Sequence, residues 1–220
     1  MKLITLEDYL ENNTKNLVVI YPGRFQPAHK NHAKVYNFLT TKFNYADVYI
    51  ATSNKILLPK SPFTFDEKKI MLQAAGVPAD KIIQTANPYQ SREILQKYDS
   101  TSTCVIFAVG AKDMDPVTPR FNFLPTKKGD AYFKPLPTLN SLTAKAIQTL
   151  YTLDKHGYVA TIPTYRFTIN IVGKNIPILG ASQIRDLYRS ASILGKKEII
   201  KQLYGSYNEN IYNIFENRLI

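Results

Sequence analysis

The feature that most constrains this chain is an alternation, in its first half, of short apolar runs with segments of helical spacing. The apolar runs are compact and rich in β-branched residues, which is typical of strands buried on both faces of a sheet. The intervening segments space apolar residues three and four apart or carry capping signals, such as the capping box of Thr64 and Glu67. Strands and helices that alternate in this way predict an α/β fold, built on a parallel sheet wound with helices.

The expected elements continue, less regularly, to the end of the chain. Strands are predicted at 17–21, 46–53, 81–86, 103–110, 157–163 and 165–173, and helices at 5–12, 30–42, 64–76, 89–99, 141–153 and 180–191. A proline-rich stretch at 113–140 is longer than ordinary connections, which predicts an ordered insertion or flap. We therefore expect one domain over residues 1–220, with that insertion and a C-terminal helical portion at 181–220.

Composition narrows the classes of protein that fit. The single cysteine, Cys104, excludes an intramolecular disulfide and a cysteine-rich zinc site, and favours a reducing, cytoplasmic setting. No apolar run is long enough to cross a bilayer, and the acidic N-terminus lacks the apolar region of a secretory signal. The net charge of +11 indicates an anionic partner. Because the basic residues are scattered, small phosphates are favoured over nucleic acid as that partner.

Two of the three histidines lie in one short segment, YPGRFQPAHKNH, after the first expected strand. The spacing of His29 and His32 places both rings on one face of a helix. A zinc site would need a third ligand, and His156 belongs to no partner motif, so we assign no metal to them. The rings could simply pack or cap the helix. Alternatively, they could bind a phosphate at the helix N-terminus, where Gly23 would let a ligand approach the backbone.

A second segment is expected at the same place in the fold. In parallel sheets wound with helices, ligands bind at the carboxyl ends of the strands. The histidine segment follows the first strand, and AVGAKD (108–113) follows the fourth. The topology therefore predicts that the two segments line a shared cleft.

Four segments together resemble the nucleotidyltransferase superfamily that carries a His-x-Gly-His motif. GRFQPAHKNH (23–32) is similar to the first signature of that family, and LGASQIR (179–185) to its C-terminal Ile-Ser-x-Thr-x-Ile-Arg. SPFTFDEKKIML (61–72) and VGAKD (109–113) are similar to two segments that lie between them. Each match is weak alone, but four in family order are specific. The middle segments also resemble phage-encoded members, which would place the protein in a host cytoplasm.

The resemblance implies a Rossmann-like, doubly wound parallel sheet with a C-terminal helical segment. It also implies an enzyme that transfers AMP from ATP to a phosphorylated acceptor and releases pyrophosphate. The GRFQP form favours nicotinamide mononucleotide as the acceptor, giving NAD. The alternatives are a CTP-dependent cytidylyltransferase acting on an alcohol phosphate, and an inactive nucleotide-binding or structural module. Magnesium, bound mainly through substrate phosphates, is the implied cofactor. A homo-oligomer is allowed, and no membrane partner is expected.

The same resemblance assigns roles to residues of this chain. The catalytic residues would be His29, His32, Arg24 and Arg185, which would stabilise charge on the phosphates. The nucleotide would be bound by Gly23, Arg24, Phe25, His29, His32, Gly110, Asp113, Ser182 and Arg185. Our candidates for binding the acceptor are Lys55, Lys60 and Arg92.

The sequence also departs from the family pattern. Asn31 stands where the family has glycine, which is used there either for a positive φ angle or to let a base approach the backbone. Ala28 replaces a phenylalanine, and Gly180 and Ser182 replace a serine and a threonine. Taken alone, the C-terminal segment has a plainer interpretation, in which Ser182 caps a helix and Arg185 faces solvent.

Overall fold

The computed structural model describes residues 15–220 except 116–119, 126, 128, 137, 138, 140, 141 and 172, and the helix expected at 5–12 lies outside these residues. The strands are β1 (Asn16–Pro22), β2 (Asp47–Thr52), β3 (Ile82–Gln84), β4 (Thr103–Val109), β5 (Phe133–Pro135), β6 (Gly157–Thr161), β7 (Phe167–Ile171) and β8 (Lys174–Ile178). The α-helices are α2 (Lys30–Lys42), α3 (Phe65–Ala74), α4 (Arg92–Leu95), α5 (Ala144–Gln148), α6 (Ala181–Ser190), α7 (Ile193–Tyr204) and α8 (Glu209–Leu219). Short 3-10 helices are η1 (Ala79–Lys81) and η2 (Ala111–Met114).

Within the described residues, six strands form one parallel sheet in the order β3-β2-β1-β4-β6-β5. β1 is central, and its Ile20 is paired with Tyr49 of β2 and Phe107 of β4. All of β4, and β1 after its first residue, is buried, which explains the continuous apolar runs of the sequence. The Rossmann-like, doubly wound fold class is confirmed. The chain adds strands first on one side of β1 and then on the other, so a ligand-binding switch point lies where β1 and β4 end.

Side chains of the central strand alternate between the two faces of the sheet. Leu17 and Val19 belong to the cluster that includes the apolar side of α2, whereas Val18 and Ile20 belong to a second cluster. On that second face, Ile94 of α4 is fully buried. Both faces of the sheet are therefore covered, as the fold class requires.

Two expected helices are shorter than predicted. Of the segment 89–99, only α4 is a regular helix, because Ser91 has a positive φ of 45° and the helix can begin only after it. Of the segment 141–153, only α5 is helical. The ammonium of Lys15 binds the carbonyl of Gln148 at 2.9 Å, which draws the end of α5 toward the start of β1.

Part of the expected insertion at 113–140 belongs to the core. Residues 133–135 form β5, the edge strand that pairs in parallel with β6. The rings of Phe121 and Phe133 pack against Phe107 of β4, each with its centroid 5.6 Å from that of Phe107. These aromatic residues, rather than a helix, cover this part of the second face.

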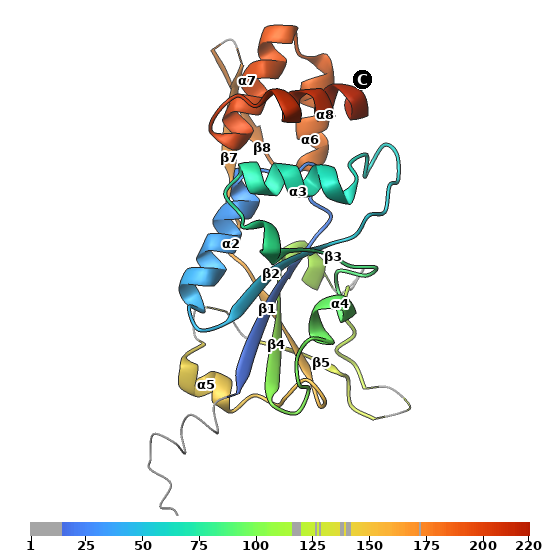
Figure 1. The fold of residues 1–220 in the computed structure, drawn as a ribbon, viewed down its shortest axis with the longest axis vertical. Helices are drawn as coiled ribbons and strands as arrows, with labels where there is room; N and C mark the ends of the chain where they lie inside the picture. Colours follow the sequence, from blue (N-terminus) through green and yellow to red (C-terminus); the bar gives the residue numbers. More distant parts are fainter. Residues whose placement is uncertain are drawn as a thin grey trace, which may run out of the picture.

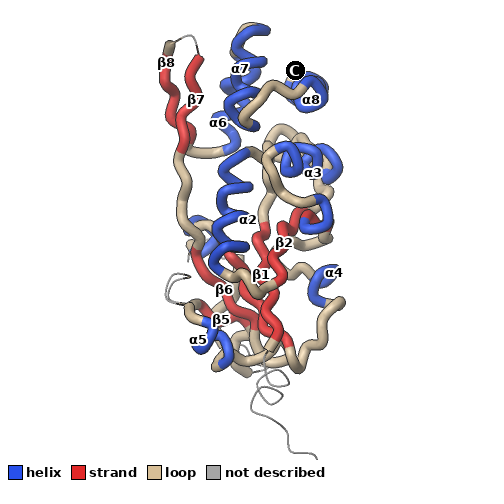
Figure 2. Tube along the Cα trace, turned by 60° about the vertical axis from the view of Figure 1, so that its left-hand side comes forward, coloured by secondary structure: helices blue, strands red, loops and turns tan. Residues whose placement is uncertain are grey.

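The C-terminal helices lie together at one end of the molecule, beyond the carboxyl ends of the central strands (Figure 1). The expected strand at 165–173 is β7, which pairs with β8 in an antiparallel hairpin outside the main sheet. β8 was not predicted, because its sequence KNIPI has no apolar run. Figure 2 shows the hairpin and these helices at the end of α2 where that helix begins. There the Tyr204 hydroxyl donates to the Ala28 carbonyl at 2.7 Å.

None of the helices in the described part of the chain is both long enough and apolar enough to span a membrane.

Candidate active site

The loop between β1 and α2 is held by tight packing. The Gly23 N–H donates to the Ala51 carbonyl of β2 at 3.0 Å. Phe25 has a positive φ of 50°, and its buried ring meets the rings of Tyr21 and His32 edge-on, at centroid distances of 5.2 and 4.9 Å. A Cβ atom on Gly23 would lie 2.8 Å from the Phe25 ring, so this packing requires glycine whether or not a ligand approaches. The strained conformation of Phe25 thus supports the ring of His32.

The two histidines cap α2 reciprocally. His29 is the N-cap residue, and its Nδ1 accepts from the Asn31 N–H at 3.3 Å. The N–H of His29 in turn donates to Nδ1 of His32 at 3.1 Å. The capping interpretation is therefore correct for the two Nδ1 atoms. Because each Nδ1 accepts a hydrogen bond, each neutral ring carries its proton on Nε2. Neither Nε2 has a hydrogen-bond partner among the described residues, so both remain available as donors.

Burial keeps both imidazoles neutral. It holds the pKa of His29 well below its usual value, with a smaller contribution from the neighbouring His32. Burial likewise lowers the pKa of His32 to about 4. At neutral pH the pair offers two N–H donors without a fixed charge.

Two adjoining cavities form the expected cleft at the carboxyl ends of β1 and β4. One, of about 330 Å³, carries the cationic side chains of Arg24, Lys112 and Arg120. The other, of about 420 Å³, is bordered by apolar side chains, which include Val35 and Ile162. The residues that line both are Tyr21, His32, Gly110, Lys112, Asp113 and Ile162. Cavities of this size suit small ligands, and the cationic end suits an anion. A further hollow of about 510 Å³, on the outer side of α2, is lined by neither histidine.

Asp113 lies at the junction of the two cavities and is already engaged. Its carboxylate accepts from the Tyr89 hydroxyl at 3.1 Å, and Nε of Arg120 lies 3.6 Å from the same oxygen. The Arg120 guanidinium also lies over the Tyr89 ring, 5.4 Å from its centroid. Tyr89, Lys112 and Arg120 were not predicted as site residues. Lys112 stands inside the VGAKD segment and could have been found there, whereas no motif marks Arg120.

Arg185 is buried, which contradicts the plain interpretation that it faces solvent. One of its terminal N–H groups donates to the Gln26 carbonyl at 2.6 Å, and its buried Nε has no partner among the described residues. Burial lowers the pKa of Arg185, and the nearby Arg189 adds to this effect. An arginine nevertheless stays charged. No carboxylate of the described residues lies within ion-pair distance of Arg185, so no ion pair in this part of the chain balances the charge of the buried guanidinium.

The interpretation of Ser182 as the cap of a helix is also wrong. The N-cap of α6 is Gly180, which makes no side-chain cap, and Ser182 is an exposed residue inside the helix. A Cβ on Gly180 would meet nothing within 4 Å, so space does not explain the loss of the family serine. The first N–H groups of α6 are thus without a side-chain cap, close to Leu179, which lines the second cavity.

Asn31 lies in the regular helix α2, and the only non-glycine residues with positive φ in the described chain are Phe25 and Ser91. The positive-φ explanation for this position is therefore wrong. The side chain is buried and lines the second cavity.

The three acceptor candidates lie away from the cleft. Lys55 and Lys60 are exposed in the loop after β2 and line neither cavity. Arg92 is exposed as well and lines a separate cavity of about 290 Å³, together with Phe107 and Phe133.

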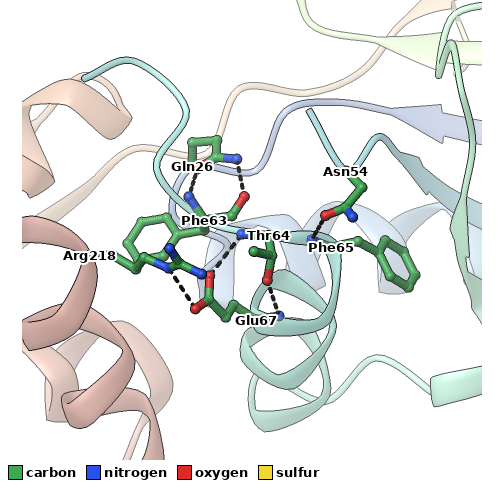
Figure 3. A network of polar contacts seen from close by, with 7 residues as sticks. All are labelled: Gln26, Asn54, Phe63, Thr64, Phe65, Glu67 and Arg218. Atoms are coloured by element: carbon green, nitrogen blue, oxygen red, sulfur yellow. Dashed lines mark hydrogen bonds and ion pairs between the residues drawn. The ribbon is translucent and has the colours of Figure 1, made fainter. Parts of the chain in front are cut away.

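A polar network joins the site loop to distant elements (Figure 3). The side-chain amide of Gln26 bonds both the N–H and the carbonyl of Phe63, at 2.9 Å each. One residue further on, Thr64 and Glu67 form the predicted capping box of α3, which is confirmed. Glu67 also accepts from Nε of Arg218 in α8 at 2.8 Å. The site loop is therefore tied through residues 63–67 to the C-terminal helix.

No group of three or more histidine, cysteine, aspartate and glutamate side chains that could hold a metal ion occurs in the described part of the chain.

A parallel sheet with a capped helix N-terminus and a cationic cleft at its switch point defines a nucleotide-binding α/β protein. Residues 20–132, just over half of the chain, match the family model described as Cytidylyltransferase-like. The chain belongs to this family, and the expected membership of the nucleotidyltransferase superfamily is confirmed. No curated protein matches the chain.

Similar solved structures include adenylyltransferases. One is a bifunctional NMN adenylyltransferase/ADP ribose pyrophosphatase from Francisella tularensis, with 18% identity over 93% of this chain and a TM-score of 0.47. The match covers 49% of that protein, so the chain spans about half of its length. Another is the Plasmodium falciparum nicotinic acid mononucleotide adenylyltransferase complexed with NaAD, with 13% identity, 92% of this chain and 96% of that chain covered, and a TM-score of 0.45.

Proposed function

We propose that the protein is an adenylyltransferase, which transfers AMP from ATP to a phosphorylated acceptor and releases pyrophosphate. The observation that carries the proposal is the histidine pair, whose two Nε2–H donors remain available at a cleft between a cationic and an apolar cavity. The GRFQP form of the first motif favours nicotinamide mononucleotide as the acceptor, with NAD as the product.

The reaction needs little chemistry from the protein. An oxygen of the acceptor phosphate attacks the α-phosphorus of ATP, and the bond from that phosphorus to the bridging oxygen breaks. The electron pair of that bond leaves with pyrophosphate. Because the acceptor phosphate is already ionised, no general base is required, and catalysis rests on positioning and charge stabilisation. His29 and His32 would donate to the α-phosphate oxygens, and Arg185 with the N-terminus of α6 would hold the outgoing phosphates.

We assign the acceptor phosphate to the cationic cavity. Arg24, Lys112 and Arg120 line that cavity, whereas Lys55, Lys60 and Arg92 do not, and so rank below them. Magnesium would neutralise and orient the phosphates. Asp113 is the carboxylate of the cleft, but Tyr89 and Arg120 already engage it, which suits an ion held chiefly by substrate oxygens.

The second candidate is a CTP-dependent transferase acting on an alcohol phosphate, and the description of the matched family favours it. An inactive nucleotide-binding module remains the third hypothesis. Nucleic-acid binding is the less favoured alternative for the anionic partner, and a homo-oligomer is allowed.

A turnover assay tests the proposal. Purified protein with Mg²⁺ is given ATP or CTP together with nicotinamide mononucleotide, its nicotinic acid analogue or glycerol phosphate, and pyrophosphate release is measured. We expect turnover with ATP and nicotinamide mononucleotide. His32→Gln should lower kcat at least about 100-fold, because it replaces the Nε2–H donor of a rigid ring by the amide of a flexible side chain, which does not hold its donor in the same position on the transferring phosphate. Glutamine three residues after the N-cap still completes a capping box, so the variant should fold.

The matched control is His156→Gln, since His156 lines neither cavity of the cleft and should tolerate the same exchange. Absence of pyrophosphate with every pair of substrates would refute the proposal, and so would full activity of the His32 variant.

A further inference from the structure

Asn31 carries an unpaired oxygen beside the apolar cavity of the cleft. Its side chain is 4% exposed and lines that cavity of about 420 Å³. The buried Oδ1 atom has no hydrogen-bond partner among the described residues. A buried amide oxygen without a donor is costly, so this group is suited to a donor that arrives with a ligand.

The orientation of this amide follows from its neighbours. Its NH₂ group donates to the Tyr165 carbonyl at 2.8 Å. Exchanging the nitrogen and the oxygen would place two carbonyl oxygens against each other, so the assignment is fixed by the hydrogen bond. The atom left over is therefore an acceptor, and it recognises only a donor.

The surroundings of Asn31 suit a flat, mainly apolar group. The same cavity is bordered by Val35, Ile162, Pro163 and Leu179, and Tyr165 lies at its edge. Residues 162–166 belong to no helix or strand, so this wall can adjust to a ligand more easily than the helix opposite. Of the two histidines, His32 lines both cavities and so lies at the junction with the cationic cavity, whereas His29 lines only the apolar one. A nucleotide with its phosphates at the histidines would thus place its base near Asn31.

We propose that Oδ1 of Asn31 selects the base by accepting a hydrogen bond from an exocyclic amino group. This inference rests on the proposed function, since it assigns the base to the cavity beside the histidine pair. Adenine and cytosine carry such an amino group. Hypoxanthine and uracil carry a carbonyl oxygen at the corresponding position, which would face Oδ1 and leave it unpaired. A site built around a buried polar group rejects analogues that lack the matching partner.

The test compares nucleotides that differ at this one group. Binding of ATP and ITP, and of CTP and UTP, is measured by calorimetry on the whole protein, together with kcat/KM for each. We expect the wild-type protein to prefer the amino-bearing member of at least one pair by roughly 10- to 100-fold, an effect of the size of one lost hydrogen bond to a buried group. Asn31→Ala should reduce this preference to within about threefold.

The matched control is Asn37→Ala, an exposed asparagine on the same helix, which should leave the preference unchanged. Equal binding of both members of each pair by the wild-type protein would overturn the inference. It would mean that solvent satisfies Oδ1. This outcome does not depend on whether the Asn31 variant folds. Turnover without discrimination leaves the proposed function standing and removes this inference. Discrimination in binding without pyrophosphate release supports the role of Asn31 but refutes the proposed transferase function. Absence of any nucleotide binding refutes both the role of Asn31 and the proposed function.

Discussion

His29 and His32 serve the helix and the cleft with different nitrogen atoms. Their Nδ1 atoms satisfy N–H groups at the start of α2, which would otherwise lack partners. The same two bonds set the tautomer of each ring and direct Nε2–H away from the cap. Capping and phosphate binding were alternative interpretations of the sequence. Capping uses the Nδ1 atoms and leaves the Nε2–H groups available, so the geometry is compatible with both.

The low pKa of His32 predicts how stability depends on pH. An unfolded histidine has a pKa near 6.5, and the folded value is about 4, so the unfolded state binds more protons between these limits. The stabilisation is complete above pH 6.5 and is lost as the pH falls toward 4. His32→Gln lacks this titrating ring, so its unfolding free energy should fall less on acidification than that of the wild-type protein. We expect a difference of about 2 kcal/mol, which is smaller than the full pKa shift would give because His32 is partly exposed. Urea unfolding of both proteins from pH 4.5 to 7.5 measures the difference, and parallel profiles would contradict it.

At the scale of elements, the loop before α2 is a junction of segments far apart in sequence. Gln26 binds the backbone of Phe63 with its side chain and Arg185 with its carbonyl. Glu67 then links the same segment to Arg218 of α8 (Figure 3). The position of Arg185 therefore depends on the loop conformation, which depends in turn on contacts to the segment that begins α3.

Gln26→Ala tests this junction. The substitution leaves the buried N–H and carbonyl of Phe63 without their partner, which should cost about 2–4 kcal/mol of unfolding free energy. Thr64→Ala is the comparison, since it removes one cap from the adjacent helix and should cost only about 1 kcal/mol. Urea denaturation ranks the two variants. A smaller loss for Gln26→Ala than for Thr64→Ala would show that the junction does not hold the loop.

For the whole molecule, a single apolar cluster runs from the sheet into the C-terminal helices. Phe63, after β2, packs against Phe215 of α8 with centroids 5.2 Å apart, and Tyr204 of α7 binds the loop before α2. The cleft lies at the carboxyl ends of β1 and β4, and Leu179, just before α6, lines its second cavity.

Such continuity predicts cooperative unfolding of one unit over residues 1–220. Thermal unfolding followed by circular dichroism should show one transition. Deleting residues 209–220, which form α8 and its end, should abolish this transition. Phe63 would lose its partner Phe215, and Glu67 would lose Arg218. Two separate transitions, or an unchanged midpoint after the deletion, would show that the C-terminal helices form an independent unit.

Local pattern accounts for the elements predicted well. β1 and β4 are continuous apolar runs, and α2 has a helical spacing of apolar residues. The Thr64 cap needs only a partner three residues away. α4 and α5 were predicted too long, because a positive φ at Ser91 and a contact from Lys15 limit them. Neither effect leaves a periodic signal in the sequence.

Neighbours along the chain are enough to predict the parallel sheet, the place of the histidine pair at its switch point and the family. The tertiary fold, by contrast, buries Arg185 on Gln26, 159 residues away, and joins Asn31 to Tyr165 across 134 residues. It also brought Arg120 beside Asp113 in the cleft. Contacts of this kind arise when separate elements pack together, and no local spacing of residues records them.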